Sequence, residues 1–198
     1  MKKILLTGFS GKKNPSRILV EEIGQELKST NDLIIKTVIL DSDYVKCENE
    51  LNKELQDFNP DYILSFGVSP EINMIELERI AINMDDSSLS DESGITRQGS
   101  KIRDDGENAY FSTLPIDKLY EEINKENIPD RRSNYAGNYL CNHILYYGLY
   151  AIEKNNLKTS MGFIHIPIPL RRKEDKNSIT IDDLKKVVKI CLQTLKDY

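Results

Sequence analysis

Four short apolar segments constrain this chain most, because each has the pattern of a strand buried on both faces of a sheet. They are Lys2–Phe9, Leu33–Leu40, Tyr62–Val68 and residues 162–167. Such near-continuous apolar runs are typical of parallel sheets that helices cover on both sides. Segments with helical periodicity separate them, so we expect an α/β fold with a parallel or mostly parallel central sheet. Sites in such folds form at the carboxyl ends of strands, where Phe9, Gly67 and His165 stand.

The first predicted helix has clear start signals. Asn14 can cap it, Pro15 suits its first turn, and apolar residues recur at helical spacing as far as Leu27. We predict one further helix that ends near Phe58, and others that span residues 115–127, 139–154 and 181–195. Other segments show different patterns: one strand at 74–83, an extended piece at 132–135, and a long surface loop or lid at 85–108.

Composition and charge exclude several classes of function. With 198 residues, the chain is long enough for one compact domain over residues 1–198. The net charge is −5 and the basic residues are scattered, so there is no electrostatic footprint for nucleic acid. The one basic run, Arg171-Arg172-Lys173, is followed at once by Glu174 and Asp175 and is typical of a solvated loop.

Apolar segments and cysteines indicate the compartment. No apolar segment reaches the length of a signal-peptide core or a membrane span, so we expect no membrane partner. Three cysteines at wide spacing, without a CxxC pair, indicate free thiols in a reducing compartment, with neither a disulfide framework nor a metal site. We therefore expect a cytoplasmic protein.

Cys141 is the best candidate nucleophile among the three cysteines. It follows Gly137 and lies at or near the start of a predicted helix, where the helix dipole favours a thiolate. Cys191 falls on the apolar face of the last helix and is expected to be a core residue. Cys47 stands in a polar stretch and is expected at the surface or at its boundary. This argument alone leaves a buried, inert Cys141 as the alternative.

The chain has only two histidines, which narrows the choice of a general base. His143 follows Cys141 by two residues, and in a helix this spacing turns the side chains to different faces, so we expect a packing or surface role. His165 lies in an otherwise apolar run at the end of a strand. A polar ring there needs a partner, so His165 is either a satisfied core histidine or a general base aimed into a cleft.

A buried carboxylate would complete a catalytic set. If residues 74–83 form one strand, Glu76 and Glu78 share a face with two isoleucines, and such a carboxylate needs a cation or a donor. A histidine from another strand is a suitable partner, because a carboxylate fixes the tautomer of the imidazole. Spacing alone does not choose between Glu76 and Glu78.

Six segments, in order along nearly the whole chain, resemble the pyrrolidone-carboxylate peptidases (pyroglutamyl peptidase type I). They are MKKILLTGF with NPS shortly after it, PDYILSFGVSP, ELERIAIN, AYFSTLPI, SNYAGNYLCNHILYYGLY and MGFIHIP. The resemblance implies a three-layer α/β/α sandwich with a twisted, mostly parallel central sheet, of the phosphorylase/hydrolase-like kind.

The resemblance also implies an activity and the residues that perform it. It places the nucleophile on Cys141, the base on His165 and the orienting carboxylate on Glu78, which decides between the two glutamates. The residues implied to bind substrate are Phe9, Tyr139 and Leu140. The implied protein is a cytoplasmic cysteine peptidase that removes an N-terminal pyroglutamyl group from peptides. It needs no cofactor and no metal, and it assembles as a homotetramer or dimer.

Two departures from the family pattern leave a second class of function open. The family's first loop, TGF-x-PFGG-x-x-x-NPS, is shortened here to TGFSGKKNPS, which removes an apolar wall of the substrate pocket. The arginine of the family's ARIPDN is Ser88, and GVSPEIN lacks another usual arginine. The alternative is a catalytically inactive or altered-specificity homologue: a binding protein, or an amidase for another small N-acyl or lactam amide.

Overall fold

The computed structural model describes residues 1–173 and 178–198. Its centre is a six-stranded sheet in the order β2-β1-β3-β8-β4-β7. The strands are β1 (Lys2–Phe9), β2 (Leu33–Leu40), β3 (Tyr62–Val68), β4 (Ile75–Glu78), β7 (Asp130–Ser133) and β8 (Ser160–Ile166). β4 pairs antiparallel with β8 and parallel with β7, so these two strands run against the other four.

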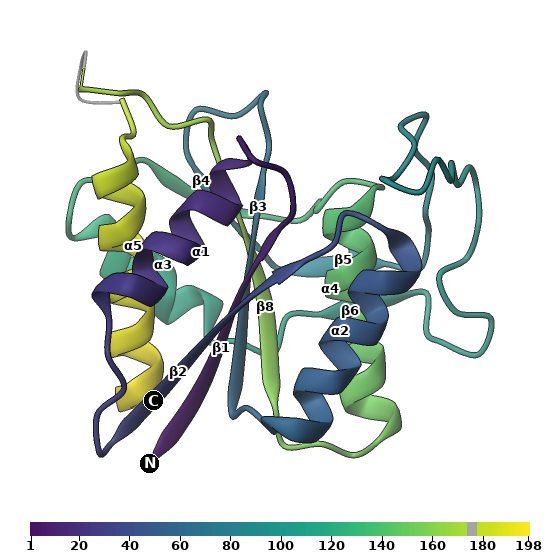
Figure 1. Ribbon diagram of the computed structural model, residues 1–198, viewed down its shortest axis with the longest axis horizontal. Helices are drawn as coiled ribbons and strands as arrows, with labels where there is room; N and C mark the ends of the chain where they lie inside the picture. Colours follow the sequence, from purple (N-terminus) through teal and green to yellow (C-terminus); the bar gives the residue numbers. More distant parts are fainter. Residues whose placement is uncertain (174–177) are drawn as a thin grey trace.

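Helices cover both faces of this sheet (Figure 1). One face carries α1 (Pro15–Glu26), α3 (Ile116–Asn124) and α5 (Ile181–Asp197), and the other carries α2 (Tyr44–Asp57) and α4 (Leu140–Lys154). Each face has its own hydrophobic cluster between sheet and helices. The predicted α/β/α sandwich with a mostly parallel sheet is therefore confirmed.

Local capping explains where several helices begin. Asn14 Oδ1 accepts the N–H of Ser16 at 3.0 Å and Pro15 occupies the first turn of α1, as predicted. Asp43 caps α2 in the same way. At α5, Thr180 and Asp183 form a reciprocal capping box.

The single strand predicted over residues 74–83 is wrong, because the chain forms two strands there. β4 ends at Glu78, and β5 (Ile80–Ile82) pairs with β6 (Ala109–Phe111) in a separate two-stranded sheet. The break falls at Arg79, whose exposed side chain donates from Nε to Asn134 Oδ1 at 2.7 Å. Glu78 and Glu76 still share a face of β4, but the isoleucines of β5 belong to another sheet.

The surface or boundary position predicted for Cys47 is also wrong. Cys47 is fully buried on the inner face of α2, in the same hydrophobic cluster as Leu51 and Leu55. The polar residues that surround it in the sequence form only the outer face of the helix. Cys191 is fully buried in α5, as expected.

Residues 85–108 form the expected long loop, and ionic contacts anchor it to the start of α4. Asp85 is fully buried and contacts His143 Nδ1 at 2.9 Å and Arg97 Nη1 at 3.0 Å. The Tyr139 hydroxyl donates to the carbonyl of Ser90 at 2.8 Å. The loop therefore lies against the helix start that carries the candidate nucleophile.

Two further expectations concern solvent and membranes. Arg171, Arg172 and Lys173 are exposed, as a solvated loop requires, whereas Glu174 and Asp175 lie outside the described residues. Among helices in residues 1–173 and 178–198, none combines the length and the apolar character of a membrane span.

Candidate active site

The candidate site follows one row of paired residues across four strands. Gly67 on β3 pairs with His165 on β8, His165 pairs with Glu76 on β4, and Glu76 pairs with Arg131 on β7. Directly paired residues point to the same face of a sheet, so their side chains lie together on the side covered by α4. Glu78 lies two residues beyond Glu76 on β4 and shares this face.

Cys141 stands over Gly67 at the start of α4. The helix begins at Leu140 with Tyr139 as its N-cap, so Cys141 is in the first turn, as predicted. A Cβ at position 67 would lie 2.7 Å from Cys141 Sγ, so the thiol approaches the sheet only because this residue is glycine. The first N–H groups of a helix lack intrahelical acceptors, so those at the start of α4 are candidate donors to a developing oxyanion.

His165 connects this thiol to a carboxylate. Its Nδ1 lies 2.8 Å from Glu78 Oε1, and the Cys141 thiol is near enough to the ring to influence its pKa. A carboxylate only accepts, so Nδ1 carries the proton and Nε2 is the nitrogen left for the thiol. Burial would lower the pKa of His165, but the Cys141 thiolate and the Glu78 carboxylate outweigh it and raise the pKa.

Glu76, the other candidate carboxylate, is engaged elsewhere. It is buried, and its Oε1 accepts from Arg131 Nε at 2.8 Å and also contacts Nη2 of the same guanidinium. The ligand atoms of Glu76, Glu78 and His165 lie within 4.8 Å of one another, which is close enough for a metal site. Because Arg131 holds Glu76 and His165 bonds Glu78, we assign these atoms to hydrogen bonds within the protein.

A cleft of about 390 Å³ opens over Cys141 and His165. Tyr139, one of the three residues implied to bind substrate, lines it. Phe9 and Leu140 are not among its lining residues, because both are buried in the hydrophobic cluster beneath α4. The structure thus brings one of the three predicted binding residues to the surface of the cleft.

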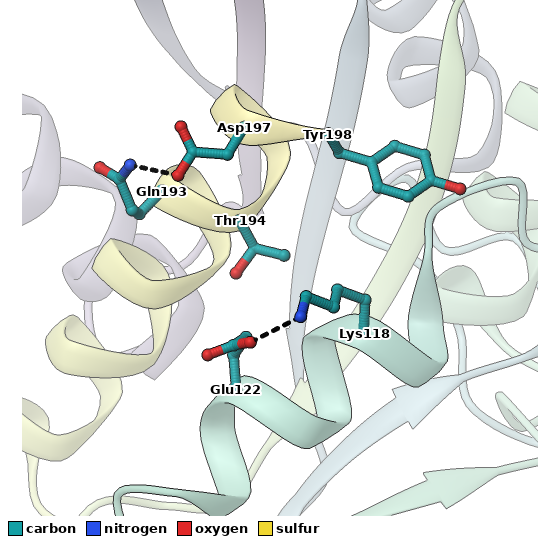
Figure 2. A pocket seen from close by; sticks show the side chains of 6 residues that line it. All are labelled: Lys118, Glu122, Gln193, Thr194, Asp197 and Tyr198. Atoms are coloured by element: carbon teal, nitrogen blue, oxygen red, sulfur yellow. Dashed lines mark hydrogen bonds and ion pairs between the residues drawn. The ribbon is translucent and has the colours of Figure 1, made fainter.

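A second hollow, between α3 and α5, offers no comparable chemistry (Figure 2). Its lining residues are Lys118, Glu122, Gln193, Thr194, Asp197 and Tyr198. Lys118 pairs with Glu122 at 2.9 Å and Gln193 donates to Asp197 at 2.6 Å, so its charged groups already have partners. With neither a thiol nor an imidazole in its lining, it holds no nucleophile and base.

His143 belongs to a separate buried cluster. Its ring is fully buried, with Nδ1 at 2.9 Å from Asp85 and Nε2 at 2.9 Å from Glu48. It does not line the cleft, so the predicted packing role is confirmed. Arg131 is the residue of the cleft that sequence reasoning missed, because it meets Glu76 from 55 positions away and no local pattern signals that contact.

Comparison with known proteins assigns this arrangement to a class. A cysteine, a histidine and a glutamate that lie together on the helix-covered face of an α/β sheet are the residue types that a hydrolase with a thiol nucleophile uses. The profile of the family described as pyroglutamyl peptidase matches residues 2–198. The chain belongs to this pyroglutamyl peptidase family.

Individual relatives match this chain over almost their full lengths. The chain is 39% identical to the pyrrolidone-carboxylate peptidase of Fusobacterium nucleatum subsp. nucleatum, covering 98% of this chain and 93% of that one. It is 38% identical to the pyrrolidone-carboxylate peptidase of Oceanobacillus iheyensis, covering 98% and 100%. The crystal structure of pyroglutamyl peptidase I from Bacillus amyloliquefaciens matches with a TM-score of 0.89 at 31% identity, covering 100% and 96%.

Proposed function

We propose that this protein is a cysteine peptidase that removes the N-terminal pyroglutamyl group from peptides. The observation that carries the proposal is that Cys141 and His165 line one cleft together, while the buried Glu78 holds His165 Nδ1 at 2.8 Å. Relatives over the full chain are named pyrrolidone-carboxylate peptidases, which supports this substrate class.

In the proposed reaction His165 carries one proton in each half, first from the Cys141 thiol to the departing amine and then from water to the Cys141 thiolate. His165 Nε2 takes the thiol proton, and the thiolate attacks the pyroglutamyl carbonyl while helix N–H groups bind the oxyanion. Protonated His165 then gives its proton to the departing amine. Water, deprotonated by the same nitrogen, hydrolyses the thioester and restores the thiol. Glu78 keeps the imidazole oriented and stabilises its charged form.

The proposed substrate pocket lies beside Tyr139, with Phe9 and Leu140 behind it as supporting apolar residues. Residues 10–13 replace the longer family loop here, and Ser10 Oγ donates to Glu92 Oε1 at 2.9 Å. The shortened loop therefore packs against residues 85–108, whose exposed Ser88 stands where the family has arginine. A lost apolar wall is worth about 1–3 kcal/mol of discrimination, so we expect specificity to differ more than chemistry.

The alternative of a relic binding protein is disfavoured by the intact site. Each of the three residues keeps its partner: Cys141 has Gly67 beneath it, His165 has Glu78, and the carboxylate is fully buried. An amidase for another small N-acyl or lactam amide would use the same residues, and only a choice of substrates separates it from the peptidase.

We further propose a cytoplasmic homo-oligomer, a tetramer or dimer, of single-domain subunits spanning residues 1–198. Three free cysteines support a reducing compartment. Phe111 and Tyr198 are each 71% exposed and line one hollow together with Leu114 and Ile116, which supports a contact between subunits.

Hydrolysis of a fluorogenic pyroglutamyl amide by the wild type and by Cys141→Ala tests the proposed activity. We expect turnover by the wild type and none above background by the variant. Alkylation by iodoacetamide, mapped by mass spectrometry, should modify Cys141 alone, because Cys47 and Cys191 are fully buried and burial raises the pKa of Cys191 to about 12.

Three outcomes would contradict parts of the proposal. A wild type without turnover, whose Cys141 is also unreactive at neutral pH, excludes the enzyme. Turnover that persists in Cys141→Ala excludes this nucleophile. Turnover of acetyl or alanyl amides without turnover of the pyroglutamyl amide assigns the site to a different amidase.

A further inference from the structure

One ion pair in the cleft has no part in the reaction described above. Glu76 is 5% exposed and lines the cleft with Cys141 and His165. Within residues 1–173 and 178–198 its ionic partner is the guanidinium of Arg131, whose side chain is 58% exposed at the cleft surface. A buried carboxylate next to a catalytic imidazole is costly unless something neutralises it, so this pair calls for an explanation.

Strand register makes Glu76, rather than Glu78, the direct neighbour of His165. On β4, Glu76 is paired with His165, whereas Glu78 is paired with Phe163. Both carboxylates share the face of the imidazole, and ligand atoms of all three side chains lie within 4.8 Å of one another. Nδ1 nevertheless bonds Glu78. What distinguishes the two glutamates is Arg131, which holds Glu76 Oε1 from the next strand.

We propose that Arg131 is a positioning residue for the catalytic set: it holds and neutralises Glu76, so that Glu78 alone orients His165. This inference rests on the proposed function, because it assigns Arg131 a place in the catalytic set. Its test does not depend on that function, because alkylation of Cys141 can be measured without turnover. Without Arg131, a second unpaired carboxylate lies beside the imidazole. It competes for Nδ1, and the loss of the guanidinium makes the site more negative by one charge.

Arg131 is well placed to set the charge of this site. Besides Glu76 and Arg131, the ionisable groups that line the cleft around His165 are Cys141 from α4, Glu71 from the loop before β4, and Tyr135 and Tyr139 from the segment before α4. The buried Glu78 contacts His165 from β4 without lining the cleft. Among these groups, in the part of the chain that the structure describes, Arg131 is the one permanent cation. Its loss leaves the glutamates without a counter-charge other than His165.

The sign of the effect follows from the charge. A more negative charge beside the Cys141–His165 pair makes each proton of the pair harder to remove. Both limbs of a bell-shaped plot of kcat/KM against pH therefore move to higher pH. A unit charge about 5 Å away shifts a titration by about 0.5 pH unit even at the dielectric constant of water, and by more in a cleft.

The test measures two pH profiles for wild type and variants. One is kcat/KM for the fluorogenic pyroglutamyl amide, and the other is the rate of Cys141 alkylation by iodoacetamide, which needs no catalysis. In Arg131→Met we expect both profiles to shift by about 0.5 pH unit or more to higher pH. Glu76→Gln/Arg131→Met should restore the wild-type position, and Arg131→Lys should keep it. Glu76→Gln alone leaves Arg131 unpaired and should shift both profiles to lower pH.

Arg132 is a matched control on the same strand. It pairs with Asp117 at 2.6 Å and covers the ring of Tyr120, on the opposite face of the sheet, so Arg132→Met should leave both profiles in place. Unshifted profiles in Arg131→Met, or a shift that persists in Glu76→Gln/Arg131→Met, would overturn the inference. A wild type that alkylates but does not turn over would instead overturn the proposed function and leave the alkylation test valid.

Discussion

The two histidines of this protein can be compared directly, because both are buried and both place Nδ1 next to a carboxylate. His165 lies 2.8 Å from Glu78, and His143 lies 2.9 Å from Asp85. The two histidines differ in what the second ring nitrogen, Nε2, faces. In His165 it faces Cys141 in an open cleft, whereas in His143 it faces a second carboxylate, Glu48, at 2.9 Å.

The surroundings of His143 make it an ionic link within the fold. Asp85 and Glu48 are each held by an arginine, Arg97 and Arg103 respectively, so a chain of alternating charges joins the loop of residues 85–108 to α2 and α4. A histidine–carboxylate pair therefore does not by itself define a catalytic base. The decisive features are a ring nitrogen without a second anion and a nucleophile within reach of it.

The largest expected effect comes from His165→Ala. Removing the base should lower kcat for the pyroglutamyl amide by about 10⁴-fold or more, because the thiol loses its proton acceptor and the amine its proton donor. The free energy of unfolding should change far less than activity. Steady-state kinetics together with urea unfolding measure both, and a loss of only tenfold would show that another group acts as the base.

His143→Leu should have the converse effect. It leaves Asp85 and Glu48 buried beside an apolar side chain, and breaking a buried ion pair of this kind costs about 3–5 kcal/mol. We expect this loss in the free energy of unfolding from urea titration, while kcat per folded molecule stays within about tenfold of wild type. A stable but inactive variant would contradict the distinction between the two histidines.

The smallest effect concerns pH. Burial would lower the pKa of His143, but Asp85 and Glu48 outweigh it and raise the pKa above the ordinary value. A raised folded-state pKa stabilises the fold fully below the unfolded pKa of about 6.5, and this contribution is lost as pH rises through the folded pKa.

The free energy of unfolding of the wild type should therefore approach that of His143→Leu as pH rises from about 6 to 9. Each unit by which the pKa is raised contributes about 1.4 kcal/mol to this narrowing. His165 titrates with the same sign but is present in both proteins, so its contribution cancels in the comparison. A difference that stays constant across this range would mean that His143 does not gain its charge on folding.

Local patterns predicted a large part of this structure. The apolar runs of β1, β2 and β3 matched their predicted bounds. β1 and β3 are largely buried, as such runs predict, whereas β2 is an edge strand that is half-buried except at Leu40. The helix start makes Cys141 a candidate nucleophile, and the family resemblance is what selects it over an inert buried cysteine. The break at Arg79 and the burial of Cys47 were missed, because alternating residues suit two short strands as well as one, and a polar stretch can hide an amphipathic helix.

The sequence by itself determined the layers of the fold, the helix starts and the identity of the residues able to act as nucleophile and base. Local patterns left Glu76 and Glu78 open, and the family resemblance named Glu78 as the partner of His165. Only the tertiary structure decided that Arg131 holds Glu76. The reason is that this contact joins residues 55 positions apart through strand register. Register is set by packing across the whole sheet, and no short stretch of sequence contains it.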